Sequence, residues 1–192
     1  MNNLFDYVTV ENLVSAELSK EILNIANRDN SSFWKDHPFS HTPDKPETFH
    51  VNWSVQDCNP ELDALISPII CTAIDRYSEI IKPITGYESE RHGDITNQFT
   101  VPRLNRYETG DKMADHADAS SITNVKHHYH APVLSFVGLL NNDFEGGKFS
   151  IRDKEYNLKA GDVVTFPSFF MYIHGASEVF KGTRYSFVSW AH

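Results

Sequence analysis

The stretch Val163–Trp190 reads VVTFPSFFMYIHGASEVFKGTRYSFVSW and alternates short runs of β-branched and aromatic residues with turn residues. The three runs predict three short strands, at Val163–Phe166, Met171–His174 and Arg184–Trp190. The same pattern begins earlier in the chain and predicts three more strands, at Phe99–Tyr107, Val133–Leu140 and Lys148–Ile151. Many short strands separated by turns are typical of a β-sandwich or barrel.

Two amphipathic helices are expected ahead of these strands. Apolar residues recur three or four positions apart within Asn12–Arg28 and again within Pro60–Ile81. The intervening Asp29–Pro60 has no sustained period and is expected to form loops, with one short strand at Phe49–Ser54. Because the helices precede the strands, we expect them to pack on one outer face of the β-structure.

Size and composition favour one domain. The chain has 192 residues, of which 40% are hydrophobic and 12% aromatic, enough for one buried core. No repeat or low-complexity linker divides it, so we expect a single domain over 1–192, with helical support over about 1–98 and the strand-rich core over about 99–192. The formal net charge of −9 argues against general nucleic-acid binding, which relies on Lys and Arg.

The cysteines and the N-terminus point to a reducing compartment. Cys58 and Cys71 are too few for a disulfide framework and do not have zinc-site spacing. The N-terminus lacks the basic and apolar segments of a signal peptide, and no apolar run reaches the roughly 18 residues of a membrane span. We therefore expect a cytoplasmic protein without a membrane partner.

Three ligand-type residues suggest a metal centre. His116 and Asp118 are two positions apart, so an extended chain directs both side chains to one face. His174 follows the apolar run Phe169–Ile173. Each feature alone is common, since such a pair arises by chance and a lone histidine is often structural. Together, two imidazoles and one carboxylate can occupy one face of octahedral Fe(II), whereas zinc more often recruits a third His or Cys.

Arg184 and Ser186 form a candidate carboxylate-binding pair. Strand alternation places both side chains on one face, and a guanidinium offers a planar fork that matches a carboxylate. The alternative is an arginine on a solvated edge strand. We favour the carboxylate site because the surrounding run is apolar and aromatic, and a buried arginine is costly unless an anion meets it.

Several motifs between Arg103 and His192 occur together in one order. They are Arg106–Gly110, His116 and Asp118, Phe144–Gly147, Ala160–Asp162, His174, Arg184, Ser186 and Trp190. In this order they resemble the 2-oxoglutarate and Fe(II)-dependent oxygenases, and within that superfamily the prolyl 4-hydroxylase-like branch.

This resemblance implies a mainly β fold with N-terminal helices. Its core would be a double-stranded β-helix, a jelly roll of the cupin-like kind flanked by α-helices. The resemblance also implies Fe(II) on His116, Asp118 and His174, with 2-oxoglutarate as co-substrate, O2 as oxidant and ascorbate as an auxiliary reductant. Tyr107 would hydrogen-bond the co-substrate, while Arg184, assisted by Ser186, would bind its distal carboxylate.

The implied function is a dioxygenase that hydroxylates a C–H bond of a peptidyl proline or another peptide side chain. The carboxylate of Asp118 favours hydroxylation over halogenation, for which the family replaces it with a small residue. An oxygenase acting on a small metabolite or nucleobase stays open. So do a cupin-like metal protein that is not an oxygenase and a catalytically dead interaction module.

Two features leave the substrate side undefined. Met113 stands where prolyl hydroxylases often have an aromatic residue, and the loop Ala119–Ala131 with its three histidines is a candidate lid or a surface loop. Four residues are candidate substrate contacts at the mouth of the site: Trp53, Arg103, Asn105 and Trp190.

Overall fold

The computed structural model describes residues 3–28, 34–37, 53–88, 91, 95–96, 98–119 and 131–192. Two α-helices, α1 (Ala16–Asn27) and α2 (Pro60–Thr85), follow a short 3-10 helix at Leu4–Tyr7. The side chains of Ser15 and Asn59 cap the two α-helices by accepting hydrogen bonds from backbone N–H groups in the first turn.

A seven-stranded antiparallel sheet forms the larger layer, with strand order β1-β10-β6-β13-β4-β3-β2. Its strands are β1 (Thr9–Asn12), β10 (Asp162–Pro167), β6 (Leu134–Leu139), β13 (Arg184–Ala191), β4 (Arg103–Tyr107), β3 (Trp53–Asp57) and β2 (Lys35–His37). The central position of β13 matters for the site, because its side chains lie between those of β6 and β4.

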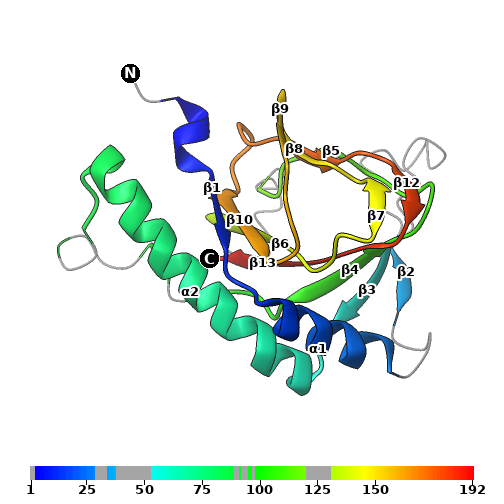
Figure 1. The fold of residues 1–192 in the computed structure, drawn as a ribbon. Helices are drawn as coiled ribbons and strands as arrows, with labels where there is room; N and C mark the ends of the chain where they lie inside the picture. Colours follow the sequence, from blue (N-terminus) through cyan, green and yellow to red (C-terminus); the bar gives the residue numbers. More distant parts are fainter. Residues whose placement is uncertain are drawn as a thin grey trace, which may run out of the picture.

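Two smaller antiparallel sheets complete the β-structure. One has the order β5-β11-β8-β9, and the other pairs β12 with β7. Their bounds are β5 (Met113–His116), β11 (His174–Ala176), β8 (Phe149–Ile151), β9 (Lys154–Tyr156), β12 (Val179–Gly182) and β7 (Phe144–Gly146). Seen along the strands, these sheets face the larger sheet across a common interior (Figure 1).

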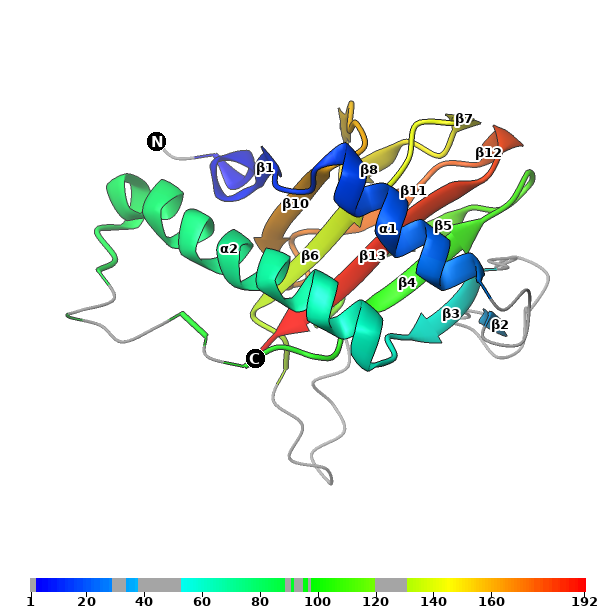
Figure 2. The same ribbon diagram turned by 60° about the horizontal axis from the view of Figure 1, so that its bottom comes forward.

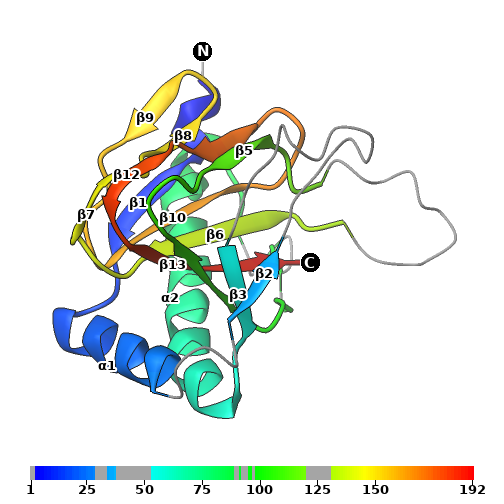
Figure 3. The ribbon, with the colours of Figure 1, turned by 90° about the vertical axis from the view of Figure 1, so that its right-hand side faces the viewer.

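The helices cover the outer face of the larger sheet, as Figure 2 shows. Buried residues of α1 and α2, such as Ile22 and Ile70, share one core cluster with Leu104, Phe136 and Phe187 from the sheet. A second cluster fills the space between the layers and contains Val137, Phe149, Ile151, Tyr156, Val164, Phe166, Tyr172 and Val188. Figure 3 shows the four-stranded sheet on the side away from the helices. The predicted mainly β fold with helices on one outer face is confirmed.

The boundaries differ from the sequence-based expectation in several places. The helix expected from Asn12 begins at Ala16, because Thr9–Asn12 pairs with β10 as β1. The strand expected from Phe99 begins at Arg103, and Phe99 forms only an isolated bridge. Strands β5, β7, β9 and β12 were not predicted, since each has only three or four residues. Of the strand expected at Phe49–Ser54, residues 49–52 lie outside the described residues.

The strand predicted at Met171–His174 is wrong. The chain turns after β10, with the backbone N–H of Tyr172 donating to the carbonyl of Phe169, and β11 only begins at His174. Four apolar side chains of this turn are exposed: Phe169, Phe170, Met171 and Ile173. Periodicity did not distinguish this apolar turn from a buried strand. In the described ranges, no helix is long and apolar enough to cross a membrane.

Candidate metal and co-substrate site

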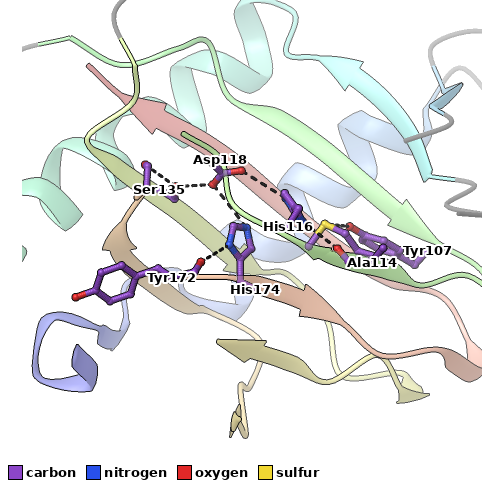
Figure 4. A network of polar contacts seen from close by, with 9 residues as sticks. Tyr107, Ala114, His116, Asp118, Ser135, Tyr172 and His174 are labelled. Carbon is purple, nitrogen blue, oxygen red and sulfur yellow. Dashed lines mark hydrogen bonds and ion pairs between the residues drawn. The ribbon is translucent and has the colours of Figure 1, made fainter. Parts of the chain in front are cut away.

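Strand pairing brings the two candidate histidines together. β5 ends at His116 and β11 begins at His174, and the two residues are direct partners in the antiparallel register. Asp118 lies in the turn after β5, with Oδ1 3.4 Å from His116 Nε2 and Oδ2 3.6 Å from His174 Nε2. One ligand atom from each residue falls within 4.8 Å of the others. Figure 4 shows the three side chains pointing toward one another.

Backbone carbonyls orient both imidazole rings. His116 Nδ1 lies 2.9 Å from the carbonyl oxygen of Ala114, and His174 Nδ1 lies 3.0 Å from that of Tyr172 (Figure 4). A proton on each Nδ1 satisfies these carbonyls and leaves the Nε2 lone pair directed at the shared centre. Two such nitrogens and one carboxylate are a donor set that suits Fe(II).

The electrostatics of the cluster differ among its members. Burial lowers the pKa of His174 to about 4 despite the nearby Asp118, so this ring is neutral at neutral pH. Burial alone would raise the pKa of Asp118, but its interactions with His116, His174 and Ser135 together hold this pKa well below its usual value. For His116, burial lowers the pKa but the bond and charge of Asp118 outweigh it, so the pKa is raised.

The buried Ser135 holds the carboxylate and is itself next to the buried Ser168, and sequence reasoning identified neither serine. The hydroxyl of Ser135 lies 2.5 Å from Asp118 Oδ2 and 2.7 Å from the hydroxyl of Ser168. The backbone carbonyl of Ser168 accepts a hydrogen bond from the N–H of Ala119, and the backbone N–H of Ser168 donates one to the carbonyl of Val133. The only sequence signal was a polar residue inside the apolar strand Leu134–Leu139.

Arg184 is buried and has no carboxylate partner among the described residues. Its side chain is 2% exposed, Nη1 donates to Ser186 Oγ at 3.0 Å, and Nε is buried without a hydrogen-bond partner. Burial lowers the pKa of Arg184. Within the described parts of the chain, no carboxylate forms an ion pair with it. The reading of Arg184 as a residue of a solvated edge strand is wrong, because β13 is central in its sheet.

Tyr107 contacts both Arg184 and the strand that carries His116. It is the register partner of Arg184, whose guanidinium carbon lies 5.2 Å from the Tyr107 ring centroid. Burial raises the pKa of Tyr107, so its hydroxyl stays protonated. That hydroxyl lies 3.6 Å from the sulfur of Met113, on the strand that ends at His116. The thioether of Met113 therefore occupies space that an aromatic residue would otherwise fill.

The candidate substrate contacts lie in different surroundings. Arg103 lies 5.0 Å over the ring of Trp190, and its charge acts to lower the pKa of His116 and of Tyr107, which places it at the site. Asn105 is buried rather than at the mouth, with 2% exposure. The side chain of Trp53 and the histidines His127, His128 and His130 lie outside the described residues.

The sequence model of the 2OG-Fe(II) oxygenase superfamily matches residues 102–192. This segment contains all six predicted site residues. Residues 102–192 therefore belong to the 2OG-Fe(II) oxygenase superfamily. A PKHD-type hydroxylase of Delftia acidovorans is 31% identical to this chain over an alignment of 98 residues that covers 47% of the chain. The matched part spans only 42% of the length of that hydroxylase.

Several solved structures with a similar fold are prolyl hydroxylases. The viral collagen prolyl hydroxylase of Paramecium bursaria Chlorella virus-1 aligns with a TM-score of 0.68 at 13% identity, covering 96% of this chain and 94% of its own. A Pseudomonas putida prolyl-4-hydroxylase gives 0.66 at 15% identity, with 96% and 91% covered. The Trichoplax adhaerens prolyl hydroxylase in complex with a hypoxia inducible factor peptide gives 0.69 at 12% identity, with 97% and 83% covered. These likenesses confirm the predicted jelly-roll fold.

Proposed function

We propose that this protein is an Fe(II)- and 2-oxoglutarate-dependent dioxygenase that hydroxylates a peptide substrate. One arrangement carries the proposal: the ligand atoms of His116, Asp118 and His174 converge in an interior that also buries Arg184 without an anion. The bound iron would activate O2, so that conversion of 2-oxoglutarate to succinate and carbon dioxide is coupled to conversion of a substrate C–H bond to C–OH.

The metal role rests on geometry and protonation. His174 Nε2, His116 Nε2 and an oxygen of Asp118 would hold the iron, since both Nδ1 atoms face backbone carbonyls. Asp118 keeps its charge because its pKa is depressed, and Ser135 holds Oδ2 in place. A carboxylate at this position favours hydroxylation, because the ligand set leaves no room for a halide in its place.

The proposed binding of 2-oxoglutarate rests on the buried positive charge of Arg184. A buried guanidinium without an anion is costly, and a carboxylate from a ligand removes that cost. Arg184 and Ser186 would bind the distal carboxylate of 2-oxoglutarate, and the protonated hydroxyl of Tyr107 would donate to the same molecule. A cupin-like metal protein without this co-substrate would have no use for the buried cation.

The interior would also exclude water from the reacting groups. Phe149 and Phe166 lie with ring centroids 5.9 and 4.7 Å from that of His174, and both are fully buried. A dry apolar wall strengthens the electrostatic contacts of bound groups and limits side reactions.

A peptide is the favoured substrate class, with peptidyl proline first. The fold is shared with prolyl hydroxylases, one of them solved with a peptide. A small metabolite is the alternative. We keep the expectation of a cytoplasmic enzyme, and ascorbate would serve only to maintain reduced iron.

Succinate release tests the proposal. The full chain, loaded anaerobically with Fe(II), is given 2-oxoglutarate, ascorbate and O2, with and without proline-rich peptides. Wild type should release succinate, with stimulation by peptide, while His174→Ala and Arg184→Ala should release none above background. Arg76→Ala, an exposed change on α2, is the matched control and should behave as wild type. No succinate from the iron-loaded wild type with any candidate substrate would refute the proposal.

A further inference from the structure

Asn105 is a buried polar residue to which the proposed chemistry assigns no role. It lies in the middle of β4, its side chain is 2% exposed, and its Oδ1 atom is buried without a hydrogen-bond partner. Buried side-chain polar atoms are almost always hydrogen-bonded, because an unpaired one loses its bond to water without compensation. A buried amide without a partner therefore requires an explanation.

The sheet register places this amide beside the proposed carboxylate site. Asn105 is the direct partner of Ser186, just as Tyr107 is the partner of Arg184. Leu104, between them on β4, packs with the helices, so strand alternation directs Asn105 and Tyr107 to the opposite, interior face. Four polar side chains thus form one block on that face, with Asn105 opposite Ser186 and Tyr107 opposite Arg184.

The block contains unsatisfied atoms on both strands. Nε of Arg184 is a buried donor without an acceptor, and the amide of Asn105 is buried without a bond at Oδ1. Nη1 of Arg184 contacts Ser186, and Ser186 is the register partner of Asn105. One ligand carboxylate in this space would face the guanidinium, the hydroxyl and the amide together.

We propose that Asn105 is a third binding residue for the distal carboxylate of the co-substrate. The amide donates an N–H to the same carboxylate that Arg184 and Ser186 bind. Rotation by 180° about the Cβ–Cγ bond exchanges the amide oxygen and nitrogen without steric cost, so the buried position can present the donor. This inference rests on the proposed function. It assigns recognition of the distal carboxylate to the guanidinium of Arg184 and to two neutral donors, the hydroxyl of Ser186 and the amide of Asn105.

Calorimetric titration of the Mn(II)-loaded full chain with 2-oxoglutarate tests this role, because Mn(II) permits binding without turnover. Asn105→Leu keeps the branching at Cγ and removes the donor. We expect its 2-oxoglutarate affinity to fall by about 10- to 100-fold, as for loss of one hydrogen bond to a charged group. Its Mn(II) affinity and melting temperature should not fall, because no hydrogen bond of the ligand-free protein is lost. Asn24→Ala, an exposed change on α1, is the control and should match wild type.

A second substitution tests the sign of the charge. Asn105→Asp places an anion beside Arg184 and should abolish measurable 2-oxoglutarate binding while the melting temperature is kept or raised. Wild-type 2-oxoglutarate affinity in Asn105→Leu would overturn the inference, as would a fall in Mn(II) affinity equal to that for 2-oxoglutarate. If circular dichroism shows that Asn105→Leu is unfolded, Asn105→Ala is used for the same test.

The same titration separates this inference from the proposed function. If wild type binds no 2-oxoglutarate, the proposed function fails and the role of Asn105 fails with it. If Arg184→Ala weakens binding and Asn105→Leu does not, only the role of Asn105 is refuted.

Discussion

The hydroxyl of Ser135 donates a hydrogen bond of 2.5 Å to Oδ2 of Asp118. Ser135 is buried near the start of β6, and its other hydrogen-bond neighbour is the buried hydroxyl of Ser168. The bond holds one carboxylate oxygen and helps to keep the Asp118 pKa low. The carboxylate is therefore oriented and charged before any metal arrives.

Ser135→Ala should weaken metal binding by about 10- to 100-fold, the usual cost of losing a partner that orients a ligand. Ser135→Thr should retain most of the affinity, since it keeps the hydroxyl. Calorimetric titration with Mn(II) measures both, with Ser78→Ala on α2 as the control. Equal Mn(II) affinities in Ser135→Ala and wild type would show that this bond does not position the ligand.

Metal affinity should fall as the pH falls through the pKa of His116. That pKa is raised, so a proton competes with the metal at higher pH than for an ordinary histidine. His174 does not add to this competition until the pH approaches 4. Below the His116 pKa, the Mn(II) affinity should drop about tenfold per pH unit, as expected for displacement of one proton. Titrations at pH 8, 7 and 6 that give one constant affinity would contradict the assignment of His116 as a ligand.

Arg184→Met should separate stability from binding. Because the ligand-free protein buries this cation without an anion, an apolar side chain of similar length should leave the melting temperature unchanged or raise it. The 2-oxoglutarate affinity should be lost in the same variant. Thermal denaturation and calorimetry on one preparation measure both, with Arg76→Met as the exposed control. A large loss of stability with intact 2-oxoglutarate binding would mean that Arg184 serves the fold.

Gly147→Ala should disturb the side chain of Arg184, because Gly147 lies against it. Gly147 has a φ of +58°, and an added Cβ would lie 2.9 Å from Arg184 Cδ and 3.1 Å from Val179 Cγ2. We expect a loss of about 1–3 kcal/mol of unfolding free energy, together with weaker 2-oxoglutarate binding. Gly110→Ala is the matched control, since its φ of +94° imposes strain but nothing lies within 4 Å of the added atom. If both variants bind 2-oxoglutarate equally well, contact with Arg184 does not matter.

The residues that sequence reasoning identified are those whose chemistry is unusual at their position. His116, Asp118 and His174 combine metal-ligand types, and Arg184 is a charge inside an aromatic strand, so the chemistry is readable without coordinates. The roles assigned to them stay predictions until a metal or co-substrate is measured. Helix α2 was predictable for a different reason, because its apolar period is long and regular.

The residues that sequence reasoning missed depend on contacts between distant strands. Ser135 lies near Asp118 only because the fold brings β6 next to the turn after β5. Asn105 was predicted as a substrate contact, and its place opposite Ser186 follows only from the β4–β13 register. A buried serine or asparagine has no distinctive local pattern. The apolar turn before His174 was misread for a related reason, since composition does not reveal that Phe170 is 71% exposed.

Anomalous diffraction from a crystal grown anaerobically with Mn(II) and 2-oxoglutarate would locate both the metal and the co-substrate. We predict one strong anomalous peak within bonding distance of His116 Nε2, His174 Nε2 and a carboxylate oxygen of Asp118, and a 2-oxoglutarate molecule whose distal carboxylate contacts Arg184. A peak elsewhere, or an ordered site with these three side chains still paired only to one another and Arg184 without an anion, would contradict it.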